Sequence, residues 1–334
     1  MQSIARPVCL ITGGAGYIGS HTARWMLEAG YKVVVLDNLF RGHREAVAPG
    51  ACLEVGDTRD RSFVDEVFGR HRPDCVIHFA ALAYVGESFE KNGEYFDVNV
   101  GGTTNILKAM NEYSCRQIVF SSSCTVYGIP ESNEPLDETA PIQSALSPYG
   151  ESKIMVERML QWQSETSGMR VVCLRYFNAA GASAEYGEDH KPETHLIPLA
   201  IDACVAGEPV LNVMGSDYET RDGTCIRDYV HVEDLASAHL LATEKLRRSE
   251  SLPFAINLGT GEGNSVIDVI GAVEKATGKK LPHRFAPRRP GDAPCLVASC
   301  ELARVSLGWE PAFPDLDSIV VSAFNWRKKF PGGY

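Results

Sequence analysis

The first half of the chain alternates short apolar runs with stretches in which apolar residues recur at helical spacing. Six runs are predicted as β-strands because they are short, rich in β-branched residues and nearly free of polar positions; they lie at 7–12, 32–37, 52–57, 74–80, 117–123 and 169–178. Helical spacing separates several of them, at 21–30, 62–70 and 102–113. Such strands are typical of a parallel sheet buried between two helix layers. We therefore expect an α/β fold with a doubly wound, Rossmann-like parallel sheet.

After Asn178 the regular alternation ends, and short segments rich in Pro and Gly follow. A regular helix is predicted at 231–246, and one further strand and turn at 255–261. We expect residues 1–177 to form the Rossmann domain, with 228–258 returning to it. Residues 178–227 and 259–334 are expected to form a smaller α/β substrate-binding domain.

One helix is predicted to begin at the segment "SPYGESK". Ser147 is a favourable N-cap, and Pro148 suits the first helical position because its missing N–H has no helical partner to lose. Tyr149 and Lys153 are then four residues apart and lie on one helix face. A nearby ammonium and the positive end of the helix dipole both favour a phenolate. The pair therefore predicts a general base that works near neutral pH, although such a pair alone is more often a solvated surface pair.

A glycine-rich loop follows the first predicted strand and opens the first helix. Gly13, Gly16 and Gly19 are spaced G-x-x-G-x-x-G, one residue longer than the usual Rossmann fingerprint. Glycines allow a tight turn and a close approach to a pyrophosphate at the helix N-terminus. Asp37 ends the next strand, where a carboxylate can bond the ribose 2′-hydroxyl and repels a 2′-phosphate. We therefore expect residues 1–177 to bind NAD in preference to NADP.

Charge and cysteine usage narrow the function classes. The net charge is −11 and no basic patch stands out, which argues against a nucleic-acid partner. The longest apolar runs, such as 33–36, are far too short to span a bilayer, so we expect no membrane partner. Because the glycine-rich loop is already reached at Gly13, we expect no signal peptide. Ten scattered cysteines without metal-ligand spacing predict reduced thiols, a cytoplasmic location and no metal.

Nine segments together resemble the extended short-chain dehydrogenase/reductase family, and within it the UDP-glucose 4-epimerases. They are "GGAGYIGSHT", "DNL", "HFAALAYVGES", "FSSSCTVYG", "SPYGESK", "RYFNAAGA", "GTCIRDYVHVEDLA", "NLGTG" and "RRPGD". Any one of them is shared with other nucleotide-sugar enzymes, but the set covers nearly the whole chain and is specific.

The resemblance implies an NAD-dependent isomerase that interconverts UDP-glucose and UDP-galactose through transient oxidation at C4. Tyr149 would take the proton from the sugar 4-hydroxyl, and Ser123 would bond the same oxygen. Lys153, in its charged form, would lower the pKa of Tyr149 and bond the nicotinamide ribose. NAD would stay bound because each turnover regenerates it. The resemblance also suggests a homodimer formed through helices of the cofactor domain.

The resemblance carries residue roles to matching positions. The cofactor-binding residues that it implies are Gly13, Gly16, Tyr17, Ile18, Gly19, Asp37, Asn38, Asp57, Thr58, Phe79, Ala80, Ala81, Asn99, Ser121, Tyr149, Lys153 and Tyr176. The substrate-binding residues that it implies are Ser123, Tyr149, Asn178, His195, Leu196, Arg227, Arg289, Asp292 and Leu296. The two arginines suit a diphosphate because a guanidinium offers paired donors. The remaining candidates His21, His78, His231 and His239 are expected to be structural.

Three positions bear on the choice of sugar. Family members often carry Lys where this chain has Ala83, and Asn where it has His195. Leu296 matches the position that this family sets against the C2 substituent of the sugar. Leu is intermediate between the aromatic residue of hexose-only enzymes and the small residue of enzymes that accept N-acetylated sugars. We therefore expect UDP-glucose and UDP-galactose as the main substrates.

Several alternatives stay open. A 4-epimerase for UDP-N-acetylhexosamines or UDP-pentoses would carry the same motifs. A nucleotide-sugar dehydratase needs an acid and a base for the elimination. Relatives with that activity resemble Thr-Asp-Glu at the positions of Ser123, Cys124 and Thr125, which offer no carboxylate in this chain. An inactive NAD-binding regulator should have lost Tyr149 or Lys153, and both are present.

Overall fold

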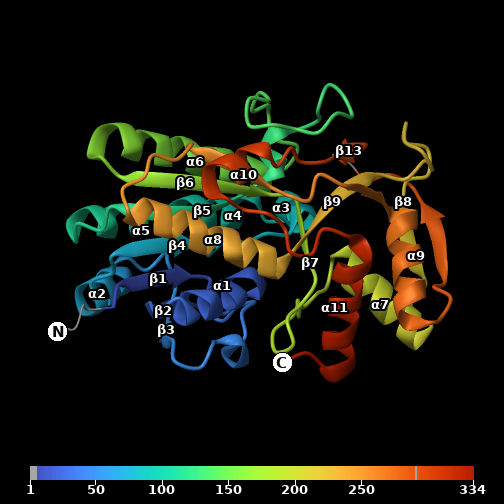
Figure 1. Cartoon of the computed structure of the whole chain (residues 1–334), viewed down its shortest axis with the longest axis horizontal. Coiled ribbons are helices and arrows are strands. Elements are labelled where there is room, and N and C mark those ends of the chain that lie inside the picture. The colour runs from blue at the N-terminus through green and yellow to red at the C-terminus, as the bar shows by residue number, and fades with distance from the viewer. Residues whose placement is uncertain (1–5, 290–291) are drawn as a thin grey trace.

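The computed structural model describes residues 6–289 and 292–334, and a seven-stranded sheet forms its larger part (Figure 1). The strands of this sheet are β1 (Val8–Thr12), β2 (Lys32–Asp37), β3 (Cys52–Val55), β4 (Cys75–His78), β5 (Gln117–Ser123), β6 (Arg170–Tyr176) and β10 (Ala255–Leu258). Their order is β10-β6-β5-β4-β1-β2-β3, and every neighbouring pair is parallel. The prediction of a doubly wound parallel sheet is confirmed.

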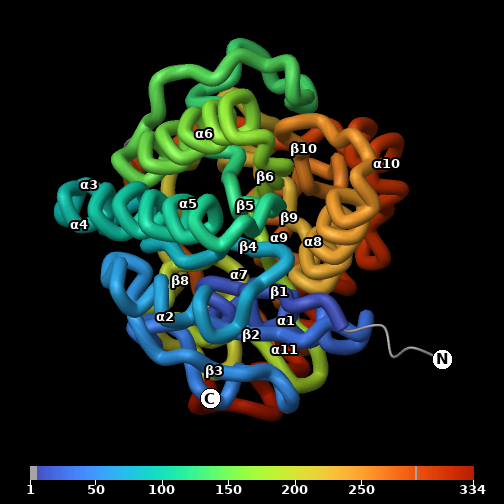
Figure 2. The backbone as a smooth tube through the Cα atoms, turned by 90° about the vertical axis from the view of Figure 1, so that its left-hand side faces the viewer, coloured from blue at the N-terminus to red at the C-terminus, as the bar shows by residue number. Residues whose placement is uncertain are grey.

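Helices cover both faces of the sheet, as the nearly uninterrupted apolar strands require (Figure 2). On one face lie α2 (Arg61–His71), α5 (Gly102–Glu112) and α6 (Pro148–Ser167). On the other face lie α1 (Tyr17–Glu28), α8 (Val232–Arg247) and α10 (Glu301–Leu307). The inner strand β4 is buried at every residue, whereas the edge strand β3 is partly exposed along its length.

The strand order reverses beside β1, whose neighbours are β2 and β4. The chain runs from β1 to β3 in one direction and then from β4 to β6 in the other. In open α/β sheets, ligands bind in the crevice at the carboxyl ends of the strands where the order reverses. The loops that follow β1 and β4 therefore border the expected cofactor crevice.

The rest of the described chain forms a second, smaller core, at the right of Figure 1. Its strands are β7 (Asn178–Ala180), β9 (Ile226–His231), β11 (Gly263–Ser265) and β13 (Cys295–Leu296) in one sheet, and β8 (Leu211–Met214) with β12 (His283–Ala286) in another. Its helices are α7 (Leu196–Ala206), α9 (Val266–Thr277) and α11 (Leu316–Lys329). The remaining short elements are α3 (Val85–Glu90), α4 (Asn92–Phe96), 3₁₀ turns at Arg44–Ala46 and Cys124–Tyr127, and a π-helical turn at Asp97–Gly101.

The later part of the chain crosses between the two cores. Residues 232–258 return to the large sheet, where α8 packs with α1 and β10 pairs with β6. Ala303 and Leu307 of α10 also join the core of the large sheet, although they lie within 259–334. The domain limits stated above therefore stay a prediction. Within residues 6–289 and 292–334, no helix is both long and apolar enough to cross a bilayer.

Candidate active site

The glycine-rich loop after β1 is pressed against the loop after β4. Gly13 has a positive φ of 70°, and a Cβ placed on it would come within 2.7 Å of the Ala80 backbone nitrogen. A Cβ on Gly19 would lie 2.2 Å from the Gly13 carbonyl oxygen. Larger residues cannot replace these glycines without moving the backbone. Gly16 caps α1 without a side-chain bond, so the first N–H groups of the helix are left for an anion.

Asp37 reaches this loop from the end of β2. Its carboxylate accepts hydrogen bonds from the backbone N–H groups of Ala15, at 3.0 Å, and Leu39, at 2.8 Å. Burial raises the pKa of this carboxyl, and the two N–H donors oppose the rise. Each carboxylate oxygen keeps acceptor capacity, which suits a ribose hydroxyl. The position of Asp37 thus fits the NAD preference inferred from its place at the end of a strand.

The residues expected to lie beside the adenine are joined by hydrogen bonds. Asn38 Nδ2 donates to Asp57 Oδ2 at 3.0 Å, and Arg59 bonds the same carboxylate through its backbone and its guanidinium. The hydrogen bonds from Arg59 hold the pKa of Asp57 at about 2. Thr58 is buried next to Gly102 of α5. Asp57 is therefore a charged acceptor at the crevice edge, already anchored by Arg59.

Asn99 connects the loop after β4 to α6. Its amide bonds both the N–H and the carbonyl of Leu82, at 2.8 and 3.0 Å, and donates to Ser152 Oγ at 2.9 Å. These bonds occupy much of its hydrogen-bonding capacity. Asn99 thus fixes the backbone that follows Phe79, Ala80 and Ala81, which the sequence placed along the cofactor crevice.

Ser123, Tyr149 and Lys153 converge at the carboxyl edge of the sheet. Ser123 ends β5, and the other two stand on the first two turns of α6. The predicted cap is present, because Ser147 Oγ accepts from the Gly150 N–H at 3.1 Å. Lys153 Nζ donates to the Ser121 carbonyl at 2.7 Å and lies 5.7 Å from the centre of the Tyr149 ring. Lys153 is buried and Tyr149 is half-buried, so the two do not form a solvated surface pair.

The pKa shifts of this pair correct one expectation. Burial raises the pKa of Tyr149 to about 12, although a hydrogen bond from Ser123 opposes the rise. Burial lowers the pKa of Lys153 to about 7, opposed by the charge of Glu157. Desolvation, which favours the neutral form of each group, therefore outweighs the expected attraction between the Lys153 ammonium and a Tyr149 phenolate. In the chain without its cofactor, Tyr149 is a neutral phenol at neutral pH rather than an activated base.

Tyr176 has a partner that the sequence did not single out. His239 Nδ1 lies 2.8 Å from the Leu235 carbonyl and must donate to it, so its Nε2 accepts from the Tyr176 hydroxyl at 2.8 Å. Burial lowers the pKa of His239 to about 4, which keeps the ring neutral. His21, His78 and His231 are also buried and hydrogen-bonded. His239, expected to be structural, thus orients an expected cofactor residue.

A buried polar network lies beneath the reactive side chains. The Glu157 carboxylate accepts from Ser122 Oγ at 2.5 Å and from Arg175 at 2.7 and 2.9 Å. Arg175 also donates to the Tyr127 hydroxyl at 2.9 Å, which in turn donates to Asn257. The network joins α6, β5, β6 and β10, and nothing in the local sequence pattern signals it.

The residues expected to bind substrate lie in two groups. Arg227 of β9 bonds the Ala293 carbonyl at 2.8 Å and reaches Asp292 at 3.5 Å, and its register partner on β13 is Leu296. Asn178 pairs in register with Tyr229 two residues further along β9. Arg289 is exposed, and Pro290 and Gly291 of the "RRPGD" motif lie outside the described residues.

The second group stands at the start of α7. His195 is the residue before the helix and Leu196 its first residue. The His195 ring bonds Glu188 at 2.6 Å and Glu193 at 3.2 Å. The structure thus shows His195 engaged with two carboxylates that the sequence analysis did not consider.

The sequence profile of the NAD dependent epimerase/dehydratase family matches residues 9–259, which are well over half of the chain. The chain belongs to this family. Its match begins in β1 and ends just after β10, so it contains the crevice, Asp37 and the Ser123–Tyr149–Lys153 group. The resemblance drawn from the nine segments is confirmed at the level of the family.

Named relatives of this epimerase/dehydratase chain cover it almost completely. The UDP-glucose 4-epimerase of Halalkalibacterium halodurans is 47% identical over 327 residues, which cover 97% of each chain. The crystal structure of the Brucella ovis UDP-glucose 4-epimerase in complex with NAD has a TM-score of 0.91 and 45% identity, over 95% of this chain and 97% of that one. The Bifidobacterium longum UDP-glucose 4-epimerase in complex with NAD⁺ and UDP has a TM-score of 0.93 and 38% identity, over 98% and 100%.

Proposed function

We propose that the chain is an NAD-dependent isomerase that interconverts UDP-glucose and UDP-galactose by transient oxidation at C4. The observation that carries the proposal is the convergence of Ser123, Tyr149 and Lys153 at the carboxyl edge of the sheet, beside a glycine loop and Asp37. Ser123 is followed by Cys124 and Thr125, so this turn offers no carboxylate for an elimination. Oxidation and return at one carbon is therefore favoured over dehydration.

NAD is the cofactor, and when bound it supplies the acceptor and later the donor of the C4 hydride. The glycine loop holds the pyrophosphate through the uncapped N–H groups of α1, and Asp37 accepts from the adenosine ribose. Tyr149 takes the proton of the 4-hydroxyl in its phenolate form, which the positive charge of bound NAD⁺ would favour, and Ser123 bonds the same oxygen. Lys153 bonds the nicotinamide ribose while the Ser121 carbonyl orients its ammonium. His239 holds Tyr176 beside the same pocket.

The UDP part is proposed to lie against Asn178, Leu196, Arg227, Arg289 and Asp292. Arg227 is largely buried, and its pKa is raised: burial lowers it, but the attraction of nearby groups, the Asp292 carboxylate among them, outweighs that effect. A buried guanidinium is a strong partner for a diphosphate. We propose that the protein binds the substrate mainly through its UDP part. The 4-keto sugar is then free to rotate and to receive the hydride on its other face.

Leu296 is proposed to limit the C2 substituent of the sugar. It is half-buried on β13 and packs beside a cluster that contains Cys124 and Phe177, next to Ser123. A leucine here leaves less room than a small residue, so UDP-N-acetylglucosamine should be slow. An N-acetylhexosamine differs from glucose and galactose at C2, so this position separates that alternative from the main proposal; a UDP-pentose differs by the absence of C6 and stays the second alternative.

We further propose a homodimer and a reducing, cytoplasmic environment. Val85 and Phe89 of α3 and Met155 of α6 are exposed, and Trp162 of α6 has 65% of its surface exposed. These two helices contact one another and form one face of the molecule (Figure 2). All ten cysteines are free, and most are buried. Trp162→Glu should shift the chain toward monomer in sedimentation; a wild type that sediments as a monomer contradicts the dimer.

The decisive experiment supplies the purified protein with UDP-galactose and no added NAD, and measures UDP-glucose. Conversion in the absence of added cofactor is expected because NAD is regenerated in each turnover. Tyr149→Phe is the matched control, since it keeps the ring and removes the hydroxyl. A protein that needs continuous NAD and accumulates NADH would instead be a dehydrogenase.

A further inference from the structure

Four side chains of the loop between β7 and α7 meet at one point. Glu188, His190, Glu193 and His195 each offer one ligand atom, and these atoms all lie within 4.8 Å of one another. The Nδ1 atoms of His195 and His190 lie 2.6 and 3.1 Å from the same oxygen, Glu188 Oε1. Glu193 Oε1 lies 3.2 Å from His195 Nδ1. Two imidazole nitrogens and two carboxylate oxygens thus surround a common centre.

We propose that this group, the 188–195 cluster, binds one divalent transition-metal ion of the zinc type. Imidazole and carboxylate ligands together suit Zn²⁺, which binds them at about 2.0–2.2 Å in a tetrahedron. Those bond lengths place neighbouring ligand atoms roughly 3.3 Å apart. The observed separations between the Nδ1 and carboxylate oxygen atoms are 2.6, 3.1 and 3.2 Å. A small outward movement, with loss of the protons between these atoms, therefore accommodates the ion.

The surroundings hold the ligands in place before any ion arrives. Glu193 Oε1 accepts from the backbone N–H groups of Thr194 and His195, at 2.7 and 2.8 Å. The Tyr84 ring meets the His190 and His195 rings edge-on, with centroids 5.7 and 6.2 Å apart. Tyr17 of α1 packs against His190 in the same way. Preorganised ligands of this kind favour binding because little freedom is lost.

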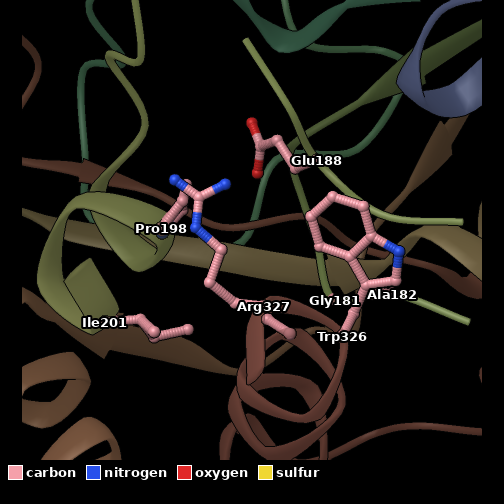
Figure 3. Close-up of a pocket in the computed structure, with 8 residues that line it drawn as sticks. Gly181, Ala182, Glu188, Pro198, Ile201, Trp326 and Arg327 are labelled. Carbon is pink, nitrogen blue, oxygen red and sulfur yellow. The ribbon is translucent and has the colours of Figure 1, made fainter. Parts of the chain in front are cut away.

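Arg327 lies near Glu188 but does not form an ion pair with it. Figure 3 shows Glu188 and Arg327 on the wall of a small cavity that Gly181, Pro198, Ile201 and Trp326 also line. Arg327 is paired with Asp202, with Nε 2.8 Å from Oδ1. Among the described residues, the ion pairs of Glu188 are those with His190 and His195. The Glu188 carboxylate therefore remains available to an ion on the histidine side.

Without an ion, the cluster is a set of histidine–carboxylate pairs. A metal would replace the proton between His195 Nδ1 and Glu188 Oε1 and hold the residue just before α7. The proposal goes beyond the proposed reaction, and it assigns the His195 side chain, expected above to contact the substrate, to the ion instead. The ion would fix the loop that connects β7 to α7 and packs against α1. It also revises the expectation of no metal.

The test uses the NAD-bound full chain after treatment with a chelator. Zn²⁺ is added in known amounts, free metal is removed by gel filtration, and bound zinc is measured by mass spectrometry. We expect about one Zn²⁺ per chain. Co²⁺ in its place should give visible absorption bands of a low-symmetry nitrogen and oxygen site. His190→Asn, which keeps a polar side chain of similar reach, should weaken Zn²⁺ binding at least about 100-fold, because loss of even an outer partner costs 10–100-fold.

A matched control comes from a second group on the surface. Cys52, Glu54 and His71 also place possible ligand atoms close together, with His71 Nε2 2.6 Å from Glu54. His71→Asn should leave the bound zinc and the cobalt spectrum unchanged. If His190→Asn fails to retain NAD, Glu193→Gln replaces it. A wild type that takes up no Zn²⁺ at micromolar concentration, or a His190→Asn protein that binds it as the wild type does, overturns the proposal.

Discussion

Replacing Glu157 tests whether the buried network positions the reactive side chains. Glu157 and Arg175 are each about 4% exposed or less and form a bidentate pair with distances of 2.7 and 2.9 Å. In Glu157→Met the guanidinium loses its counter-charge and stays buried. Breaking a buried pair from one side costs about 3–5 kcal/mol, because an uncompensated charge remains. For a chain of this size that cost lowers Tm by roughly 5–10 °C.

The double variant Glu157→Met with Arg175→Met separates charge from packing. Replacing both partners by apolar residues is often nearly neutral, so it should recover most of the loss. Thermal unfolding at one fixed NAD concentration gives the Tm values of the wild type, Glu157→Met, Arg175→Met and the double variant; the concentration is fixed because bound ligand also raises Tm. We also expect the double variant to lose activity, because Glu157 lies one turn beyond Lys153 and bonds Ser122, the neighbour of Ser123.

Three results would each refute a part of this reasoning. A Glu157→Met protein that melts within 1 °C of the wild type would show that the pair is not truly desolvated. A double variant as unstable as the sum of the two single variants would show that the residues act independently. Full kcat in a double variant of restored stability would show that the network supports the fold but does not position Tyr149.

Three further predictions concern single residues. Tyr149→Phe should reduce kcat by about 10²–10⁴-fold, measured by conversion of UDP-galactose, while calorimetric binding of UDP stays near that of the wild type; an unchanged kcat at neutral pH removes Tyr149 from the mechanism. Asp37→Ala should weaken NAD binding and reduce the difference in affinity between NAD and NADP, because the carboxylate repels a 2′-phosphate. Fluorescence titration measures both affinities, and equal affinity of the wild type for the two cofactors would contradict this. Leu296→Ser should raise kcat/KM for UDP-N-acetylglucosamine, and Leu296→Tyr should remove that activity; each substitution should change the activation free energy for this sugar by about 1–3 kcal/mol. If the ratio of kcat/KM for UDP-N-acetylglucosamine and UDP-galactose is the same in the wild type and both variants, Leu296 does not limit the C2 substituent.

One prediction follows from the pKa of Lys153. Burial lowers that pKa from 10.5 to about 7 in the NAD-free chain. The unfolded chain therefore binds more protons between these values, and the cost of burying this lysine is largest below pH 7 and fades toward pH 10. Lys153→Met should accordingly stabilise the NAD-free protein at pH 6.5 by up to about 5 kcal/mol, at ~1.4 kcal/mol per pKa unit, and by much less at pH 9.5. Denaturant unfolding at the two pH values measures it, and an equal effect at both would contradict the shift.

Local sequence patterns were enough to predict the strands and helices of the large sheet and many residues of the cofactor crevice. Apolar runs predicted the strands from β1 to β6, and Ser147 with Pro148 predicted the start of α6. These signals are short in range, because they depend on residues within one or two turns of each other. The glycine spacing and Asp37 were readable for the same reason, since strand, loop and helix follow one another directly.

Contacts between distant segments were decided only by the tertiary structure. Gly13 needs its small size because Ala80, far along the chain, lies against it. His239 of α8 meets Tyr176 of β6, and Tyr84 meets the histidines of the 188–195 cluster. No sequence spacing encodes these distances.

The electrostatic state of the reactive pair shows most clearly why. The sequence placed Tyr149 and Lys153 four residues apart and predicted that their proximity would favour the phenolate. Only the packing of α6 against the sheet determined how little water reaches them. Burial raises the pKa of Tyr149 and lowers the pKa of Lys153, so both shifts favour the neutral form. A one-dimensional pattern records which charges are neighbours, but desolvation depends on every segment that covers them.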